Sequence, residues 1–395
     1  MSRRLQHPGR APRRAAAAQR GLTLIELMVS MVITLIIVAA LLALYLNVTQ
    51  TNREMLKVNR QIESGRLAVH LLENQVAHAG FWENYMPQFD DLTLTTVPAS
   101  VPTGAAPDPC LAYTVVDWTD AYKQSLLDIP VQAYDGVPAG CAAVVTHKKA
   151  NTDVLVVRHA ETCVAAAGGS ANCEADIVGK LYFQSSACAT QPPSSFELNT
   201  AGFTAVLSKD CTAAAFKRKF VSSIYYVRDY AETVGDGIPT LVRSRMEMSG
   251  GLPTHQESVA LIEGIEGFRV ELGLDTLGKT GLAVDYTQAV NWVDPSNKIT
   301  PTNRGDGSPD GAFVHCSAGT PCTADQFINA VAVKLHVLAR STESSPGHTD
   351  TKDYILGGTT AAPFKLGPFN DQFKRHVFAT TVRLTNVTGR RETPP

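Results

Sequence analysis

The residue with the clearest chemical meaning is Glu26, a carboxylate inside an apolar run. Leu22 to Leu46 is a stretch of 25 residues, and Glu26 is its one charged residue. A charge in an apolar span is costly in lipid, so such a residue points to a function. The chemistry open to an isolated carboxylate in this setting is pairing with a cation that another chain supplies in a packed assembly.

The run that carries Glu26 is long enough to span a membrane. A bilayer core requires about 20 apolar residues in a helix, and no Pro or Gly interrupts this run. Six arginines and no acidic residue precede it, so the positive-inside rule keeps residues 1–21 cytoplasmic and places the rest of the chain outside. A secretory signal peptide would be shorter and would end in a small-residue cleavage site, which residues 45–50 do not supply. A plain single-pass anchor explains the length of the run but not its charge.

The helix is expected to continue beyond the apolar run. Apolar and small residues recur at spacings of three and four, which is the period of an amphipathic helix. They are Met55, Val58, Ile62, Gly65, Val69, Leu72, Val76 and Ala79. We therefore predict one helix from about Leu22 to Ala79, roughly 85 Å long. Its amphipathic part, residues 47–80, would support a globular head, with Gly80 as its C-terminal cap.

The start of this helix resembles a known signal. Gly21-Leu22-Thr23-Leu24-Ile25-Glu26 is similar to the class III signal of type IV prepilins and pseudopilins, with Leu22 where Phe is usual. The resemblance implies that prepilin peptidase cleaves between Gly21 and Leu22 and that Leu22 becomes N-methylated. It also implies that the carboxylate of Glu26 faces the N-terminal ammonium of a neighbouring subunit. Residues 1–21 would then be a leader that is lost.

The rest of the chain predicts a sheet-bearing head. Six segments are rich in β-branched residues or alternate between apolar and polar ones: residues 153–158, 223–228, 240–247, 268–272, 331–337 and 377–384. We expect a turn at residues 236–239 and a short helical turn near residues 325–329. The predicted fold is α+β and type IV pilin-like, with the long helix packed on a mainly antiparallel head over residues 81–386. Residues 387–395 are expected to form a loose tail.

Cysteines occur only in the part of the chain predicted to lie outside the cell membrane. An even number in an oxidising compartment indicates disulfides. Eight cysteines allow 105 pairings, and pairing by proximity in sequence would join Cys110 to Cys141, Cys163 to Cys173, Cys188 to Cys211 and Cys316 to Cys322. No Cys-x-x-Cys and no His pair with ligand spacing is present, so we predict no metal site.

Composition and motifs disfavour nucleic-acid binding and catalysis. The formal charge is −2, and loss of the six leader arginines leaves 29 basic and 37 acidic residues, a charge of −8. An acidic head argues against non-specific DNA binding, although residues 217–219 form a local basic stretch. No nucleophile elbow, phosphate-binding glycine loop or zinc-protease motif occurs. We therefore predict no catalytic residue, no cofactor and no specific nucleic-acid partner.

Several head segments resemble one pilin family. They are residues 225–228 with 236–241, residues 261–266, residues 331–334 with 338–341, and residues 375–378 with 382–386, and they are similar to PilW, a minor pilin of type IV pilus assembly. The resemblance implies a non-catalytic subunit that is held in the inner membrane with its head in the periplasm. It would then prime the pilus, and its place would be at the pilus tip. Its partners would be other minor pilins, the major pilin and a PilY-type tip adhesin.

Two alternatives stay open at this point. A minor pseudopilin of type II secretion shares the signal and the helix, so these features do not separate the two systems. The middle region, residues 99–215, resembles no family, and its cysteine-rich insertions could bind a ligand at the tip.

Overall fold

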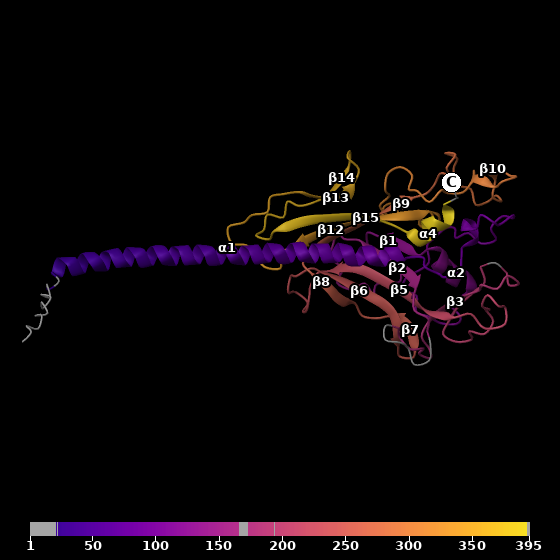
Figure 1. Ribbon diagram of the computed structural model, residues 1–395, viewed down its shortest axis with the longest axis horizontal. Helices are drawn as coiled ribbons and strands as arrows, with labels where there is room; N and C mark the ends of the chain where they lie inside the picture. Colours follow the sequence, from indigo (N-terminus) through magenta and orange to yellow (C-terminus); the bar gives the residue numbers. More distant parts are fainter. Residues whose placement is uncertain (1–20, 22, 166–172, 193, 393–395) are drawn as a thin grey trace, which may run out of the picture. The chain divides into compact units, whose positions relative to one another are not determined.

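The structure is a computed structural model, and it describes residues 21, 23–165, 173–192 and 194–392. The chain divides into two compact units, residues 1–56 and residues 57–395, and each is described by itself. Figure 1 labels the helices and strands.

Helix α1, Leu24–His78, closely matches the predicted helix. In the first unit, no side chain between Leu24 and Leu56 is buried, and Leu24 and Ile25 are 79% and 72% exposed. This helix is long and apolar enough to cross a membrane. Because so much contiguous apolar surface is unfavourable in water, this part of α1 needs lipid or other helices around it.

From Lys57 onward, α1 belongs to the head, and its buried face differs in part from the predicted stripe. Gly65 and Leu72 are buried as expected, but Gln61 and Ala68 are buried as well. Ile62, which lies on the predicted stripe, is 37% exposed. The buried face is therefore shifted by one residue at two positions, from Ile62 to Gln61 and from Val69 to Ala68.

The first sheet of the head has eight strands, and all their pairings are antiparallel. The long strand β5 lies at its centre, between β2 on one side and β3 and β6 on the other. The strands are β1 Val131–Tyr134, β2 Val154–Ala160, β3 Tyr182–Ser185, β4 Phe196–Asn199, β5 Lys217–Arg228, β6 Thr240–Ser249, β7 Leu252–His255 and β8 Val259–Glu263.

The second sheet has three antiparallel strands in the order β15-β12-β9. They are β9 Ile265–Leu274, β12 Ala330–Arg340 and β15 Arg375–Arg383. Two small hairpins lie outside both sheets: β10 Trp292–Asp294 with β11 Ile299–Pro301, and β13 Tyr354–Gly358 with β14 Pro363–Leu366.

Short helices complete the head. They are a 3-10 turn at Gln88–Asp90, α2 Asp120–Asp128, α3 Ala324–Ile328 and α4 Thr385–Arg391. Helix α2 begins where the side chain of Thr119 accepts a hydrogen bond from the N–H of Tyr122, and α3 begins with a capping box between Thr323 and Gln326.

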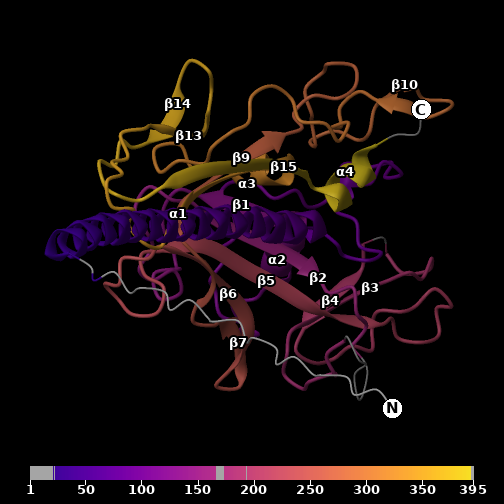
Figure 2. The ribbon, with the colours of Figure 1, turned by 60° about the vertical axis from the view of Figure 1, so that its left-hand side comes forward.

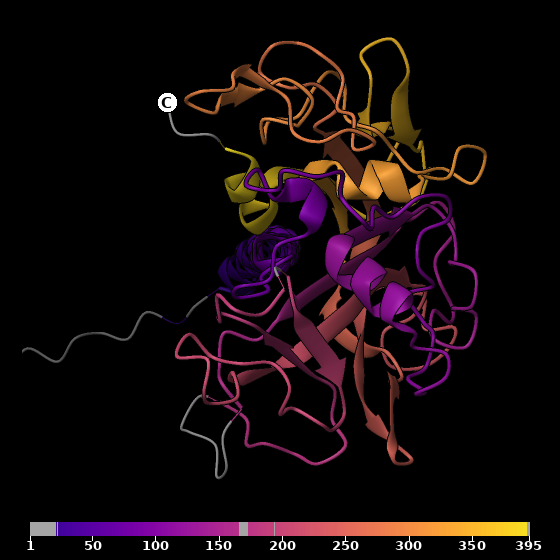
Figure 3. The same ribbon diagram turned by 90° about the vertical axis from the view of Figure 1, so that its right-hand side faces the viewer.

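The main core lies where the two sheets meet the head part of α1. Ala68, Leu72 and Val76 pack there with residues of both sheets, such as Leu155 from β2 and Val333 from β12. Figures 2 and 3 show the first sheet on one side of this part of α1 and the second sheet on the other. The predicted α+β fold, a long apolar helix with an antiparallel head, is confirmed.

Four disulfides join cysteines that are neighbours in the sequence. The pairs are Cys110–Cys141, Cys163–Cys173, Cys188–Cys211 and Cys316–Cys322, the same pairs that proximity in sequence indicates. Three of them lie in the middle region of the chain, residues 99–215.

The expected loose tail is wrong for most of its length. Residues 385–391 form α4, in which Val387, Thr388 and Arg391 are buried. The expectation failed because the segment is polar and its order comes from buried ion pairs, which composition does not reveal. Residues 393–395 lie outside the described residues.

Gly65 provides a test of how α1 packs on the head. A Cβ atom at this position would lie 2.1 Å from Cε2 of Phe378 on β15. Gly65→Ala would gain about 1 kcal/mol of helix propensity, but overpacking costs about 1–3 kcal/mol. We expect a net loss of about 1 kcal/mol in the free energy of unfolding, measured by chemical denaturation of the full chain in detergent. In a Phe378→Leu background the same substitution should be neutral or stabilising, and an equal loss in both backgrounds would contradict this contact.

Candidate functional site

The predicted signal residues lie at the start of α1. Gly21 is exposed, and Leu22 lies outside the described residues. The carboxylate of Glu26 accepts hydrogen bonds of 3.0 Å from the backbone N–H and from the hydroxyl of Thr23. In return, the hydroxyl of Thr23 accepts a bond of 3.4 Å from the N–H of Glu26.

This reciprocal pair is a capping box, which satisfies N–H groups that the first turn of a helix leaves without partners. The pattern Thr23-x-x-Glu26 before an apolar run is the sequence signal for such a box, and it was not among the predictions above. Glu26 therefore has a local structural role in addition to the assembly role that the resemblance implies. Any test of its charge has to separate the two roles.

The part of α1 that belongs to the head is held by polar side chains of the helix, which donate hydrogen bonds to main-chain carbonyls of the head. Nε2 of the buried Gln61 donates to the carbonyl of Ala339 at 2.8 Å, and Nζ of Lys57 donates to the carbonyl of Ser344 at 2.7 Å. Because both acceptors lie at or just beyond the end of β12, these bonds set the position of the helix along the second sheet.

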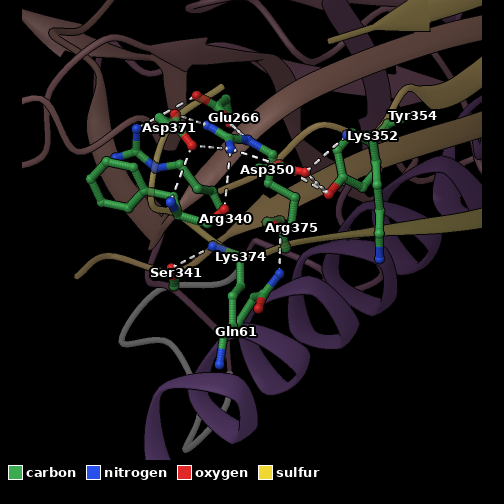
Figure 4. Close-up of polar contacts among 12 residues, drawn as sticks. Gln61, Glu266, Arg340, Ser341, Asp350, Lys352, Tyr354, Asp371, Lys374 and Arg375 are labelled. Carbon is green, nitrogen blue, oxygen red and sulfur yellow. Dashed lines mark hydrogen bonds and ion pairs between the residues drawn. The ribbon is translucent and has the colours of Figure 1, made fainter. Parts of the chain in front are cut away.

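Next to Gln61, a buried arginine organises the head (Figure 4). Arg375 donates to Glu266 at 2.6 Å, to Asp350 at 2.9 Å and to both carboxylate oxygens of Asp371 at 2.6 Å. Arg340 and Lys149 approach Glu266 at 3.5 and 3.8 Å. Burial by itself would lower the pKa of Arg375, but the three carboxylates raise it above its usual value. The guanidinium therefore stays charged and ties the start of β15 to β9 and to the loop between β12 and β15.

The segments that resemble PilW in sequence come together at this cluster. Glu266, Arg340 and Arg375 belong to three different segments, and Nη2 of Arg340 donates to the carbonyl of Gly237, in a fourth, at 2.6 Å. Each segment alone resembles an ordinary strand or turn. Their shared role is to provide charges and carbonyls to one buried network, which no single segment could reveal.

The C-terminal helix α4 closes the end of α1. The amide of Asn386 donates to the carbonyls of Ala77 and Ala79 at 3.3 and 3.1 Å, and Nη2 of Arg390 donates to the carbonyl of Gly80 at 2.6 Å. These are carbonyls that a helix leaves without partners at its C-terminus. The predicted cap, Gly80, has a φ of +72°.

Arg391 anchors α4 in a buried acidic site. Nε of Arg391 donates to Asp90 at 2.9 Å, Nη1 to Asp275 at 3.1 Å, and Nη2 to the carbonyl of Ile328 at 2.7 Å. Burial would lower the pKa of Arg391, but Asp90 and Asp275 raise it. The site thus links α4 to the 3-10 turn at Gln88–Asp90 and to Asp275, the residue after β9.

The basic stretch at residues 217–219 is neutralised by nearby carboxylates. Its three cations lie 2.7 Å from Asp176, 2.8 Å from Glu83 and 2.5 Å from Glu247, respectively. Because DNA binding depends on cations that are available to phosphates, this arrangement gives no support to electrostatic capture of DNA.

One group of potential metal ligands occurs within the described ranges, and it consists of Asp108, Cys110 and Cys141. The two sulfur atoms form a disulfide, so they do not offer thiolates to a metal ion.

Comparisons with known proteins agree with the sequence resemblance. Residues 224–386 match the model of the type IV pilus-assembly protein W family, PilW, and residues 17–42 match the prokaryotic N-terminal methylation motif. The first match includes every head segment in which the resemblance was seen, and the predicted resemblance to PilW is confirmed. None of the curated proteins is significantly similar in sequence. Among solved structures, a type IV-like pilin from Thermus thermophilus is similar at 13% identity and a TM-score of 0.31, over 83% of this chain and 98% of that one.

The anchor of α4 can be tested by comparing two arginines of the same C-terminal segment. Arg391→Met leaves the buried carboxylate of Asp275 without its cation and leaves Asp90 with Arg390 at 3.7 Å, so we expect a loss of about 3–5 kcal/mol in the free energy of unfolding. Arg383 pairs with Glu392 at the surface, and Arg383→Met should cost less than about 1 kcal/mol. Urea unfolding of the full chain in detergent measures both values. Similar effects of the two substitutions would show that α4 is not anchored as described.

Proposed function

We propose that this chain is a PilW-type minor pilin of the type IV pilus and that it helps to prime pilus assembly. It is anchored in a membrane by the apolar part of α1, and we propose that its head lies in the periplasm before it enters the pilus. In this proposal the chain is a structural subunit without catalytic activity, and it joins a short complex at the pilus tip. Its partners there are other minor pilins, the major pilin and a PilY-type tip adhesin.

The observation that carries the proposal is the exposed apolar surface of α1 between Leu24 and Leu56, where no side chain is buried. Lipid can cover it while the chain waits in the membrane, and the helices of other subunits can cover it in a filament. Exchange of one apolar environment for the other changes little hydrophobic free energy, so packing and charge decide the outcome.

Glu26 provides the charge. After cleavage behind Gly21, an N-terminal ammonium would be available on each subunit. A carboxylate that is unpaired in lipid becomes favourable when it meets such a cation, so assembly relieves the cost of its desolvation. The pairing would therefore favour the filament over the free subunit.

The two roles of Glu26 can be separated by two substitutions. Glu26→Gln removes the charge but keeps a side chain that can complete the capping box with Thr23, whereas Glu26→Ala removes both. We expect both variants to be processed normally and to be reduced about tenfold or more in the sheared pilus fraction, measured by immunoblot against the membrane fraction. If Glu26→Gln enters pili like the unsubstituted chain while Glu26→Ala does not, the capping box rather than the charge is what assembly requires.

The proposed processing has its own test. Mass spectrometry of the chain purified from cells with pili should find N-methyl-Leu22 as the first residue. An N-terminus at Met1, or one beyond residue 46, would contradict cleavage by prepilin peptidase. A strain without prepilin peptidase serves as the control, because the leader should remain on the chain there.

A further inference from the structure

The strand β15 is the outermost strand of the second sheet. It pairs with β12 over nine consecutive residues, from Arg375 to Arg383, without a register shift. Because residues of an antiparallel strand alternate in the direction of their N–H and C=O groups, half of the β15 residues bond to β12 and the other half point outward.

Hydrogen bonds on the far side of the sheet identify which half points outward. On β9, the even residues bond away from β12: for example, Val270 N–H donates to Asp153 at 2.7 Å and Leu272 N–H donates to Val314 at 2.7 Å. The odd residues of β9 therefore bond to β12. With the registers of the two strand pairs, this places the outward groups of β15 at Val377, Ala379 and Thr381.

These outward backbone groups have no strand beside them to pair with. Over the described part of the chain, the N–H groups of Val377, Ala379 and Thr381 have no hydrogen-bond acceptor. The side chains of His376, Ala379 and Thr381 are exposed. The strand therefore presents a regular row of free donors and acceptors to solvent.

The other outermost strands are protected in ways that natural sheets commonly use. Strands β1 and β4 have four residues each, β7 contains Pro253, and β8 is short with a register shift in its pairing. The outer edge of β9 is covered by hydrogen bonds from Asp153, Asp310 and Val314. Among the described strands, β15 alone is a long, regular and uncovered edge.

We propose that β15 is a docking edge, to which an extended segment of another minor pilin adds as a fourth strand of the second sheet. The backbone groups of Val377, Ala379 and Thr381 would provide the pairing, as in other cases of β-strand addition. The identification of the partner as another minor pilin rests on the proposed function. The open edge itself is inferred from the strand pairings and the backbone hydrogen bonds.

The surroundings of β15 define the chemistry of the added segment. Ile62 and His376 line a hollow of about 250 Å³ beside the start of β15. The side chain of Ile62 is 37% exposed. An apolar side chain on the face of the added strand that is turned toward α1 would cover it, because alternate residues of a strand share a face.

Charge further narrows the choice of partner. Lys352 and His376 line the same hollow, whereas the carboxylates of Asp350 and Asp371 nearby are bonded to Arg375. An acidic residue at that end of the added segment would therefore be favoured. Residues 375–383, the segment that self-pairing would add, contain no acidic residue and have an arginine at each end, so a second copy would bring further basic residues to this edge. The charges thus favour a different chain over a second copy.

Proline substitution tests the edge without removing bonds to β12. Ala379→Pro deletes an outward N–H, and proline is tolerated at such an edge position. Ala379→Ser changes the same side chain and keeps the N–H. We expect both variants to fold with unchanged thermal midpoints in detergent, and we expect Ala379→Pro alone to lose surface pili in cells. Normal piliation with Ala379→Pro would overturn the proposal, and if Glu26→Gln still blocks assembly, the proposed function is unaffected.

Photo-crosslinking identifies the occupant even if the proline variant fails to fold. A photoreactive residue is placed at His376 or Thr381, which lie on opposite faces of β15, and at Val259 on β8 as the matched exposed control. We expect both β15 positions to crosslink to the same epitope-tagged minor pilin and Val259 not to do so. Crosslinks from neither position, from only one face, or only to a differently tagged copy of this chain would each overturn the proposal. So would slow hydrogen exchange of the Ala379 and Thr381 amides in the isolated chain.

Discussion

Helix α1 has to be stable beside lipid and beside a polar head, and one unbroken hydrogen-bonded helix meets both demands. From Leu24 to Leu56 its side chains are unburied and mostly apolar, whereas from Gln61 to Val76 one face is buried in the head. Its two ends are completed differently. Thr23 and Glu26 satisfy the first turn, and Asn386, more than 300 residues later, satisfies the last carbonyls.

The head is built around this helix by a few specific contacts. The close approach at Gly65 lets the ring of Phe378 reach the helix backbone, and Gln61 binds the end of β12. The buried networks around Arg375 and Arg391 then fix the strands and α4. Buried ion pairs add little net stability compared with apolar packing. We interpret their role as setting the arrangement of segments, because an incorrect arrangement would leave a buried charge without its partner.

The sequence predicted the elements whose signal is local and long. The helix follows from a period of 3.6, and the strands β2, β5, β6, β9, β12 and β15 follow from β-branched content or from a period of 2; all are present. Strands β1, β3 and β4 escaped prediction because each has only four residues, too few to show an alternation. Helix α4 was taken for a loose tail because the polar residues that anchor it are ordered by distant carboxylates.

What the sequence by itself determined is the type of protein: the Gly21–Glu26 signal, the apolar helix and the family segments are all local patterns. Only the tertiary structure decided where those segments meet, how the C-terminus caps α1, and which edge strand stays open. The physical reason is distance along the chain. Arg375 and Glu266 are 109 residues apart and Arg391 and Asp90 are 301 apart, and no local pattern encodes contacts of that separation.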